Sequence, residues 1–400
     1  MILRESHPNA SPTKQEGEDM PYQPLSEVRD TLNPQWYRSK IRPERFRELS
    51  KRDDRKGWVQ AGGHFALFCL TGTAVYLTWA QGWWLLFLIA LFAHGTIASF
   101  FRGTSVHELG HRTVFQSKRL NDVFLYLFSM ISWWNPFDYA ASHTYHHRYT
   151  LHPEGDREVL LPIHPNVGRT FLLQMFTLNL LTQPGRTFGK GGVLSTIWMT
   201  MLDAVGKLPS IDVPANEWLH ALHEDQPDQA RKSMRWSRIQ LVFHGFVLVL
   251  AIATGQWVLP LILTLPSYIA NWLSYFLGLT QHCGLTAATT DFRKNTRSIR
   301  LPKFVEFLYW HMNWHTEHHM YAGVPCYNLP LLAEEIKADM PEPRTLRGAW
   351  REMLDTWKRQ KTDPDYAFDT PLPATAKTTR RQAAGDDEKS IGDLAPKGLA

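Results

Sequence analysis

Residues 310–319 read Trp310-His311-Met312-Asn313-Trp314-His315-Thr316-Glu317-His318-His319. On a helix, His315, His318 and His319 occupy positions i, i+3 and i+4, so their three imidazoles project from one face about a turn apart. One helical face can therefore offer three nitrogen ligands to a metal ion.

The same spacing recurs elsewhere in the chain. His143, His146 and His147 repeat it, and His107 and His111 form a two-histidine version. With 18 histidines in 400 residues, one His-x-x-x-His pair is expected roughly once by chance, but His-x-x-His-His only about a few hundredths of a time. Two copies of the longer pattern indicate metal ligation rather than solvated or core histidines.

Two long runs contain no Asp, Glu, Lys or Arg, at residues 57–101 and 239–290. Each is long enough for two membrane crossings of about 20 residues. Polar turns at 80–82 and 254–256 interrupt them. We therefore predict an all-α integral membrane protein. It has four transmembrane helices in two hairpins, at about 57–80, 82–101, 236–254 and 256–279, and a helical cytoplasmic cap that carries the histidine boxes.

Cationic residues flank both runs, whereas the hairpin tips carry no charge. Those next to the runs include Arg52, Arg55, Lys56, Arg102, Arg231, Lys232, Arg235, Arg238, Arg293 and Lys294. By the positive-inside rule, both termini and the middle segment face the cytoplasm, so all histidine boxes share one side. Because this topology accounts for the net charge of +5, we expect contact with membrane lipids and no nucleic-acid partner.

Composition also sets the domain boundaries and the redox setting. Residues 1–30 and 369–400 are polar and are predicted to be disordered, which leaves 31–368 as one membrane domain. The N-terminus lacks a cleavable signal pattern, so the first membrane helix is expected to direct insertion. Cys69, Cys283 and Cys326 form no spaced pair, which excludes a disulfide framework and a thiolate zinc site and fits a reducing cytoplasmic face.

Several shorter helices are expected outside the crossings. An interfacial helix is predicted at 43–51, the second box on a helix at 140–150, and helices of the cap at 331–337 and 345–358. Apolar stretches at 123–134, 170–182 and 193–205 are too short to span a bilayer and are predicted to lie at its interface.

Other polar residues are candidates for the site. His282 follows the fourth predicted crossing and would be the ninth imidazole. Glu108 and Asp156 are candidate acceptors for ligand N–H groups, because metal-bound imidazoles commonly donate to carboxylates, although a surface-turn role for Asp156 is equally open. For His64, His94 and His244, inside the apolar runs, we favour hydrogen bonds to a neighbouring helix over a direct role.

Nine neutral imidazoles exceed what one metal ion can hold, so their number indicates two ions or a large surplus. Imidazole suits iron, copper, zinc and nickel, whereas magnesium and calcium prefer oxygen. A metal pair at the mouth of a membrane bundle indicates redox or hydrolytic work on a lipid-phase substrate. The residues alone do not decide between redox and hydrolytic chemistry.

The boxes at 107–111, 143–147 and 315–319, together with Gln281-His282, resemble the membrane fatty acid desaturase and hydroxylase superfamily of histidine-box di-iron proteins, over about 57–330. Asn313-Trp314-His315, Met320-Tyr321 and Val324-Pro325 look similar to a branch of bacterial and fungal desaturases, alkane-type hydroxylases and small-molecule oxygenases. The resemblance implies two non-haem iron ions, dioxygen as co-substrate and attack on an unactivated C–H bond. Its implied ligands are His107, His111, His143, His146, His147, His282, His315, His318 and His319.

Departures from the superfamily refine the expectation. The third box begins with His315 rather than Gln, and no His-Pro-Gly-Gly haem motif is present, so electrons are expected from a separate cytochrome b5 or ferredoxin with its reductase. His311 stands where this branch is expected to have Asn, which makes it a candidate ligand partner or spare ligand, against a plain surface role.

Three functions remain at this point. Our first hypothesis is desaturation of an acyl chain or similar lipid, in the endoplasmic reticulum membrane if the chain is eukaryotic or the inner membrane if it is bacterial. The alternative is a hydroxylase or monooxygenase acting on a small hydrophobic metabolite or alkane-like substrate. A metal transporter would need polar residues along the crossings, and these have almost none.

Overall fold

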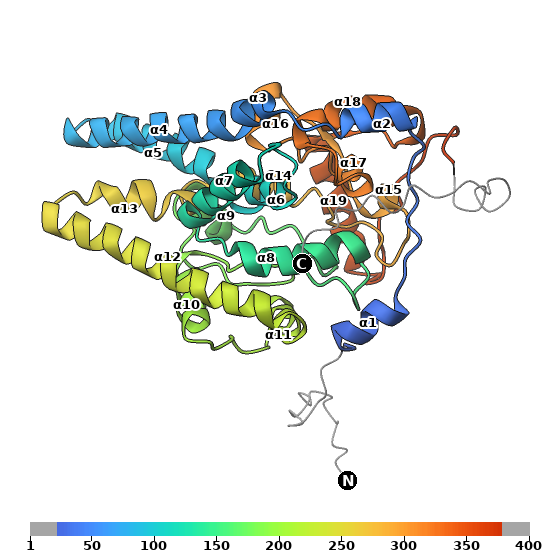
Figure 1. Cartoon of the computed structure of the whole chain (residues 1–400), viewed down its shortest axis with the longest axis horizontal. Helices are drawn as coiled ribbons and strands as arrows, with labels where there is room; N and C mark the ends of the chain where they lie inside the picture. The colour runs from blue at the N-terminus through green and yellow to red at the C-terminus, as the bar shows by residue number, and fades with distance from the viewer. Residues whose placement is uncertain (1–21, 378–400) are drawn as a thin grey trace, which may run out of the picture.

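The computed structural model describes residues 22–377, and the remaining parts of the two predicted disordered tails lie outside them. The described chain is mostly helical (Figure 1). Its only regular strands are β1 (Ile299–Arg300) and β2 (Arg344–Thr345), which pair in parallel. Two helical hairpins project from one end, and the shorter helices gather at the other.

The first hairpin joins α4 (Gly63–Ala80) to α5 (Trp84–Ser99), and α4 continues α3 (Asp54–Gly57) and η1 (Trp58–Gly62). Gly82 turns the chain with a φ of +67°, a conformation that glycine adopts without strain. The second hairpin joins α12 (Pro227–Thr254) to α13 (Val258–Leu263), and Gly255 ends α12 at a φ of +68°. The chain therefore turns near 80–82 and 254–256, where the sequence has polar residues.

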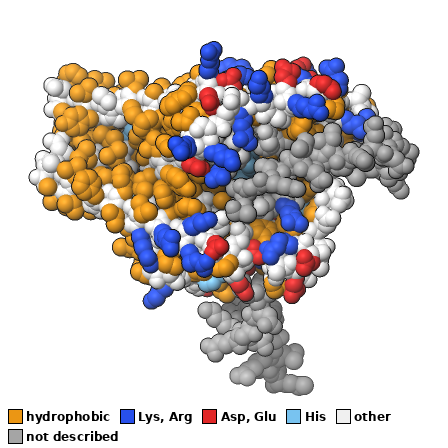
Figure 2. All heavy atoms as spheres, in the orientation of Figure 1, with side chains coloured by type: hydrophobic (Ala, Val, Ile, Leu, Met, Phe, Trp, Pro, Cys, Tyr) orange, Lys and Arg blue, Asp and Glu red, His pale blue; other side chains and the backbone are white. Residues whose placement is uncertain are grey.

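Two helical segments, Trp84–Gly110, which is kinked at Arg102 and Gly103, and Pro227–Thr254, are long and apolar enough to cross a membrane. Apolar side chains cover most of the visible surface at the hairpin end, and charged side chains lie toward the other end (Figure 2). Leu85 and Val242, for example, are more than two-thirds exposed. Because water disfavours so much contiguous apolar surface, this end is suited to contact with lipid.

The prediction of a continuous fourth helix over 256–279 is wrong. After α13, the chain forms the short 3-10 turn η3 (Pro266–Tyr268) and then α14 (Trp272–Gly278). Pro266 has no backbone N–H to donate and its ring clashes with the preceding turn of a helix. The proline therefore prevents one helix from continuing, and His282 follows α14 in a turn.

Several of the other helices lie close to predicted ones, but those at 214–225, 292–295 and 303–308 were not predicted. The remaining helices are all shorter than α4, α5 and α12. They are α2 (Pro43–Leu49), η2 (Phe101–Ser105), α6 (Val106–Gly110), α7 (Lys118–Ile131), α8 (Pro136–Tyr149), α9 (Arg169–Phe176), α10 (Val193–Ala204), α11 (Pro214–Asp225), α15 (Phe292–Asn295), α16 (Lys303–Leu308), α17 (His315–Met320), η4 (Cys326–Asn328), α18 (Leu329–Ile336), η5 (Lys337–Asp339) and α19 (Leu346–Gln360). The third box is helical only from His315, because Trp310 and His311 both have positive φ.

Both tails are ordered closer to their ends than predicted. Helix α1 (Leu25–Thr31) buries Leu25 and Val28 against α11, so the prediction of disorder is wrong there. It is also wrong for 369–377, where Asp369 pairs with Lys294 at 2.6 Å and Arg293 donates to the Lys377 carbonyl at 2.7 Å. Apolar spacing at i and i+3 gives α1 one buried side.

His64, His94 and His244 each connect two separate segments of the fold. Their Nε2 atoms lie 3.0–3.1 Å from backbone carbonyls on another segment, those of Ile97, Ile262 and Met130 respectively. The other ring nitrogen of each is also hydrogen-bonded, with Trp310, Thr71 and Thr264 as the partners. The expectation of interhelical hydrogen bonds is therefore confirmed.

Candidate metal centre

The nine box histidines come together in two groups, each with its ligand nitrogens within 4.8 Å of one another. The five-histidine group consists of His107, His111, His143, His147 and His318. The four-histidine group consists of His146, His282, His315 and His319. Stretches more than 200 residues apart in the chain thus converge, as one shared site requires.

Helices α8 and α17 each contribute to both groups. On α8, His143 and His147 are one turn apart and join the five-histidine group, while His146 joins the other. On α17, His315 and His319 join the four-histidine group, while His318 joins the five-histidine group. The i, i+3, i+4 spacing therefore places two imidazoles in one group and one in the other.

The Nε2 atoms point inward within each group. Their separations are 2.7 Å for His107 and His318, 3.2 Å for His318 and His147, 3.3 Å for His143 and His111, 2.9 Å for His315 and His282, and 3.1 Å for His319 and His315. Two metal–nitrogen bonds of about 2.1 Å at a right angle span about 3 Å, so this spacing is that of neighbouring ligands on one ion.

The outward Nδ1 atoms meet hydrogen-bond partners on the surrounding chain. His143 faces Glu158, His146 faces Asp156, His107 faces the Tyr139 hydroxyl, and His282 faces the Asn295 carbonyl, each at 2.9 Å, and His319 faces the Thr150 hydroxyl at 3.2 Å. Such partners fix the orientation of ligand rings and raise their basicity. The donor set therefore fits a pair of metal ions.

Two carboxylates after α8 support the rings differently. Asp156 was a sequence candidate, and it accepts hydrogen bonds from the backbone N–H groups of Leu151 and Glu158 as well as facing His146. Glu158, which sequence reasoning missed, also accepts from Ser142 at 2.6 Å. Burial raises the pKa of Glu158 to about 7. Burial also acts to raise the pKa of Asp156, but His146 and the backbone N–H groups of Leu151 and Glu158 together outweigh it and lower that pKa.

The two other sequence candidates differ in their placement. Glu108 is fully buried, with Oε1 3.2 Å from His318 Nδ1 and 3.8 Å from His107 Nε2. Neither carboxylate oxygen has a hydrogen-bond partner among the described residues, so an oxygen donor lies free beside the five-histidine group. His311 instead lies 3.6 Å from Glu306 and belongs to neither group.

Burial also sets the protonation of the ligands. Burial, with neighbouring imidazoles, holds the pKa of His143, His147, His315, His318 and His319 well below the ordinary value. Burial lowers the pKa of His282 to about 3. These rings are therefore neutral near pH 7, which is the form that binds metals.

The donor atoms restrict the choice of metal. Nine imidazole nitrogens with an adjacent carboxylate suit iron, copper, nickel or zinc, and they are a poor match for calcium or magnesium. A redox-active ion held at each group would suit chemistry that moves electrons to dioxygen.

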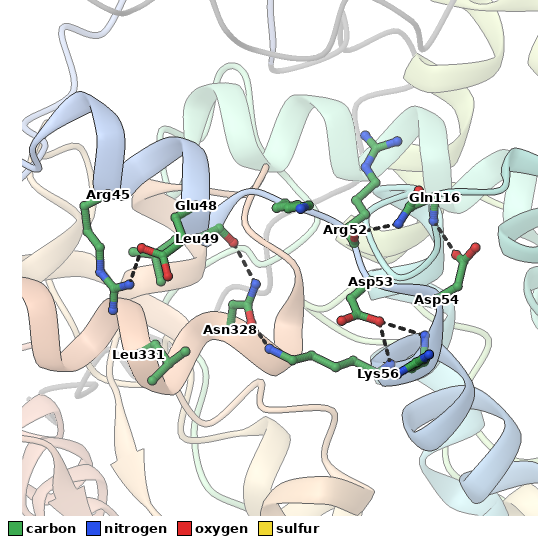
Figure 3. Close-up of a pocket in the computed structure, with 12 residues that line it drawn as sticks. Arg45, Glu48, Leu49, Arg52, Asp53, Asp54, Lys56, Gln116, Asn328 and Leu331 are labelled. Carbon is green, nitrogen blue, oxygen red and sulfur yellow. Dashed lines mark hydrogen bonds and ion pairs between the residues drawn. The ribbon is translucent and has the colours of Figure 1, made fainter.

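A separate charged cavity of about 540 Å³ lies where α2, α3 and α18 meet (Figure 3). None of the nine histidines lines it. In Figure 3, the Lys56 ammonium reaches the Asn328 side chain at 2.9 Å, and Asp53 accepts from the backbone at the start of α3. This cavity is thus distinct from the candidate metal centre.

Apolar hairpins joined to a cap with paired histidine groups define the class of a helical protein suited to lipid contact and to metal binding. The family model for fatty acid desaturase matches residues 81–350, more than half of the chain. The chain therefore belongs to the fatty acid desaturase family and is an oxidoreductase, which confirms the resemblance seen in the sequence. It is also 22% identical over 346 residues to an sn-1 oleoyl-lipid 12-desaturase of Anabaena variabilis, covering 80% of this chain and 89% of that protein.

Proposed function

We propose that this protein is an oxygen-dependent di-iron oxidase that introduces a double bond into an acyl chain or similar lipid. The observation that carries the proposal is the convergence of nine imidazoles into two adjacent groups. In the balanced reaction the substrate loses two hydrogen atoms, and dioxygen takes up these, two electrons and two protons to give two waters. The electrons would come from a separate donor, cytochrome b5 or a ferredoxin with its reductase.

The residues divide the work between holding metal and fixing geometry. The five-histidine and four-histidine groups would each hold one iron, and iron would supply the activation of dioxygen. Asp156 and Glu158 would keep the rings of His146 and His143 in the ligating orientation. Glu108 would add an oxygen donor or hold a proton beside His318.

We further propose a multi-pass arrangement in the membrane. Four crossings with cytosolic termini would place the cap and both histidine groups on one side, within reach of a soluble electron donor. The exposed apolar surface of both hairpins supports this arrangement (Figure 2). The host membrane would be the endoplasmic reticulum in a eukaryote or the inner membrane in a bacterium.

Hydroxylation is the second candidate function, because the same histidine set would serve it on a small hydrophobic or alkane-like substrate. The sequence around Asn313-Trp314-His315, similar to a branch that contains hydroxylases and oxygenases, favours keeping it. A product that gains the mass of one oxygen, with no alkene formed, would establish hydroxylation and overturn desaturation.

The deciding experiment is expression in a host with a competent reductase, followed by lipid and metabolite profiling and measurement of bound iron. His315→Ala is the inactive control, because His315 Nε2 lies near both His282 and His319. We expect a new unsaturated lipid and bound iron in the wild type alone. Turnover by a purified chain that contains no transition metal would overturn the proposal.

A further inference from the structure

Three rings in contact, the outer two stacked and the inner two tilted by 42°, run from the protein surface to the four-histidine group. Trp36, which is partly exposed, stacks on Phe292 with ring centroids 4.1 Å apart and planes within 9°. Phe292, which is 1% exposed, lies 5.5 Å from the imidazole of His319. Direct ring-to-ring contact therefore connects solvent to a candidate metal ligand.

The outer ring is held firmly in place. Trp36 Nε1 donates to the Arg148 carbonyl at 2.9 Å, and the next residue, Tyr37, bridges to Asp291. The buried Arg293 guanidinium lies 3.8 Å from the Tyr37 ring centroid and pairs with Asp291 at 2.7 Å. These contacts therefore hold the Trp36 ring in one position on Phe292.

The surface around Trp36 is basic, and the metal centre comes close to solvent there. Arg38 and Arg148 are exposed, and the side chain of Arg38 has no ion pair among the described residues. Arg148, whose carbonyl accepts from Trp36 Nε1, directly follows His147 in the chain. His147 and His111 are the two ligands that are not fully buried. A partner that docks here should therefore present negative charge.

We propose that the surface formed by Trp36, Arg38 and Arg148, the Trp36 face, is the docking site of an acidic one-electron carrier protein, and that the Trp36, Phe292 and His319 rings form the electron path inward. The inference rests on the proposed function. In each encounter the carrier is oxidised by one electron and the metal held by the four-histidine group is reduced by one. Two encounters supply the two electrons that one turnover requires.

Two measurements test the path and the docking separately. For the path, reduction of the iron-loaded protein is followed by stopped-flow absorbance with reduced soluble cytochrome b5, with reduced soluble ferredoxin, and with dithionite. Trp36→Leu should slow reduction by the carrier by at least about tenfold, because it leaves a gap in this path. Reduction by dithionite should be unchanged, and Trp36→Phe should keep most of the wild-type rate.

The matched control is Trp357→Leu. Trp357 is another partly exposed tryptophan, and its ring contacts are with His164 and Lys361 rather than with a box histidine. Its substitution should leave reduction by both carriers unchanged. Equal rates for Trp36→Leu and wild type with both carriers would overturn the proposed path.

For docking, binding of each carrier to the metal-free protein is measured at low and high salt. Arg38→Glu with Arg148→Glu should raise the Kd at least about tenfold at low salt, and less at high salt, because exposed charges are screened. An unchanged Kd for both carriers would overturn the docking site.

The failure of this inference can be told apart from the failure of the proposed function. If dithionite-reduced wild-type protein forms no product with lipid and dioxygen, the proposed function fails, whatever the Trp36 variants do. Suppose instead that the product forms, and that the Trp36 and Arg38 variants accept electrons from the carriers and bind them as the wild type does. The proposed function then stands, and only the inference about the Trp36 face is overturned.

Discussion

His318 shows how a single residue links the two histidine groups. It lies on the same turn of α17 as His315 and His319, yet its Nε2 points to His107 and His147 in the other group. Its Nδ1 faces the carboxylate of Glu108 at 3.2 Å. Substitution at this position therefore removes a ligand and leaves a buried carboxylate without its nearest neighbour.

We predict that His318→Ala lowers bound iron and abolishes product formation, since the five-histidine group loses a nitrogen near its centre. His311→Ala, on the preceding turn and paired with Glu306, should retain iron and activity. Iron is measured by elemental analysis of purified protein. Equal iron in both variants would contradict the ligand assignment.

Glu158 gives a second prediction at the residue scale. Glu158→Gln replaces the carboxyl group that faces His143 Nδ1 at 2.9 Å with a weaker acceptor, so iron affinity or activity should fall about 10- to 100-fold. Glu154→Gln, on the exposed turn nearby, is the matched control and should have no such effect. Competition with a chelator measures the affinity, and a loss of the same size in both variants would show a general effect of the turn.

Glu306 predicts a dependence of stability on pH. Burial raises the pKa of this carboxyl, but contacts with His311, Lys303 and Trp314 outweigh burial and lower it to about 2. A pKa lowered by folding means that the carboxylate stabilises the fold fully above about pH 4.5, and that this contribution disappears as pH falls toward 2.

We therefore expect Glu306→Gln to cost about 1–3 kcal/mol at pH 7, because Trp314 Nε1 loses a charged acceptor at 2.6 Å. The difference in thermal unfolding temperature between the variant and the wild type should narrow between pH 4.5 and 3. A difference that stays constant over this range would show that the carboxylate charge contributes nothing.

The sequence predicted the ligands better than their partners, for a physical reason. His315, His318 and His319 lie within one helical turn, so local spacing alone puts them on one face. Tyr139, Thr150 and Asn295 reach the ring nitrogens through tertiary packing, and a lone hydroxyl or a backbone carbonyl leaves no pattern in the sequence. The acidic residues Asp156 and Glu158 could both have been recognised from the sequence, but only Asp156 was predicted.

At the scale of elements, the backbone of α5 packs directly against the turn that follows α13. A Cβ at Gly95 would lie 2.7 Å from the carbonyl carbon of Ile269, which is backbone and cannot rotate away. Helix α5 therefore reaches this turn so closely only because residue 95 has no side chain. The same turn contains Pro266, which interrupts the fourth predicted crossing.

Gly95→Ala should destabilise the protein by about 1–3 kcal/mol through overpacking. Gly245→Ala, in α12, is the control, because a Cβ there meets nothing within 4 Å and should stabilise the helix by up to about 1 kcal/mol. Thermal unfolding in detergent compares the two. Similar unfolding temperatures would contradict the close contact.

Helix positions were predictable wherever a strong local signal marked them. Gly82 and Gly255 interrupt the apolar runs at the observed tips. Helix α8 begins at Pro136, four residues before the predicted start at 140, because the Asn135 side chain caps it. The break after α13 was not predicted, because residues 256–279 are all uncharged and the helix-breaking effect of their prolines was not taken into account. Helix α1 was missed because its seven residues are stabilised by α11 rather than by their own sequence.

At the scale of the whole molecule, the hairpin tips and the cap should lie on opposite sides of the membrane. Single cysteines are placed at Gln81, Thr254 or Glu154, which are all exposed, after Cys69 is replaced by Ser. A membrane-impermeant maleimide added to sealed vesicles should label the two tips from one side and Glu154→Cys from the other. Labelling of all three from one side would contradict four crossings.

The overall architecture could be predicted because hydropathy and charge indicate whether a segment favours lipid or water, and this preference does not depend on detailed packing. Uncharged runs predicted long apolar helices, and the spacing of the histidines predicted that the boxes would come together at one site. The division of nine ligands into five and four required the relative rotation of α8 and α17, which depends on packing between segments far apart in the chain.

The first ordered residues have a practical consequence for anyone who prepares this protein. Leu25 and Val28 insert beside α11, and Trp36 rests on a residue that touches His319. Trimming the amino end back to the first apolar hairpin would remove these contacts while all nine histidines of the two groups remained encoded. Shortened clones should begin upstream of Pro24, and purification tags belong before that point.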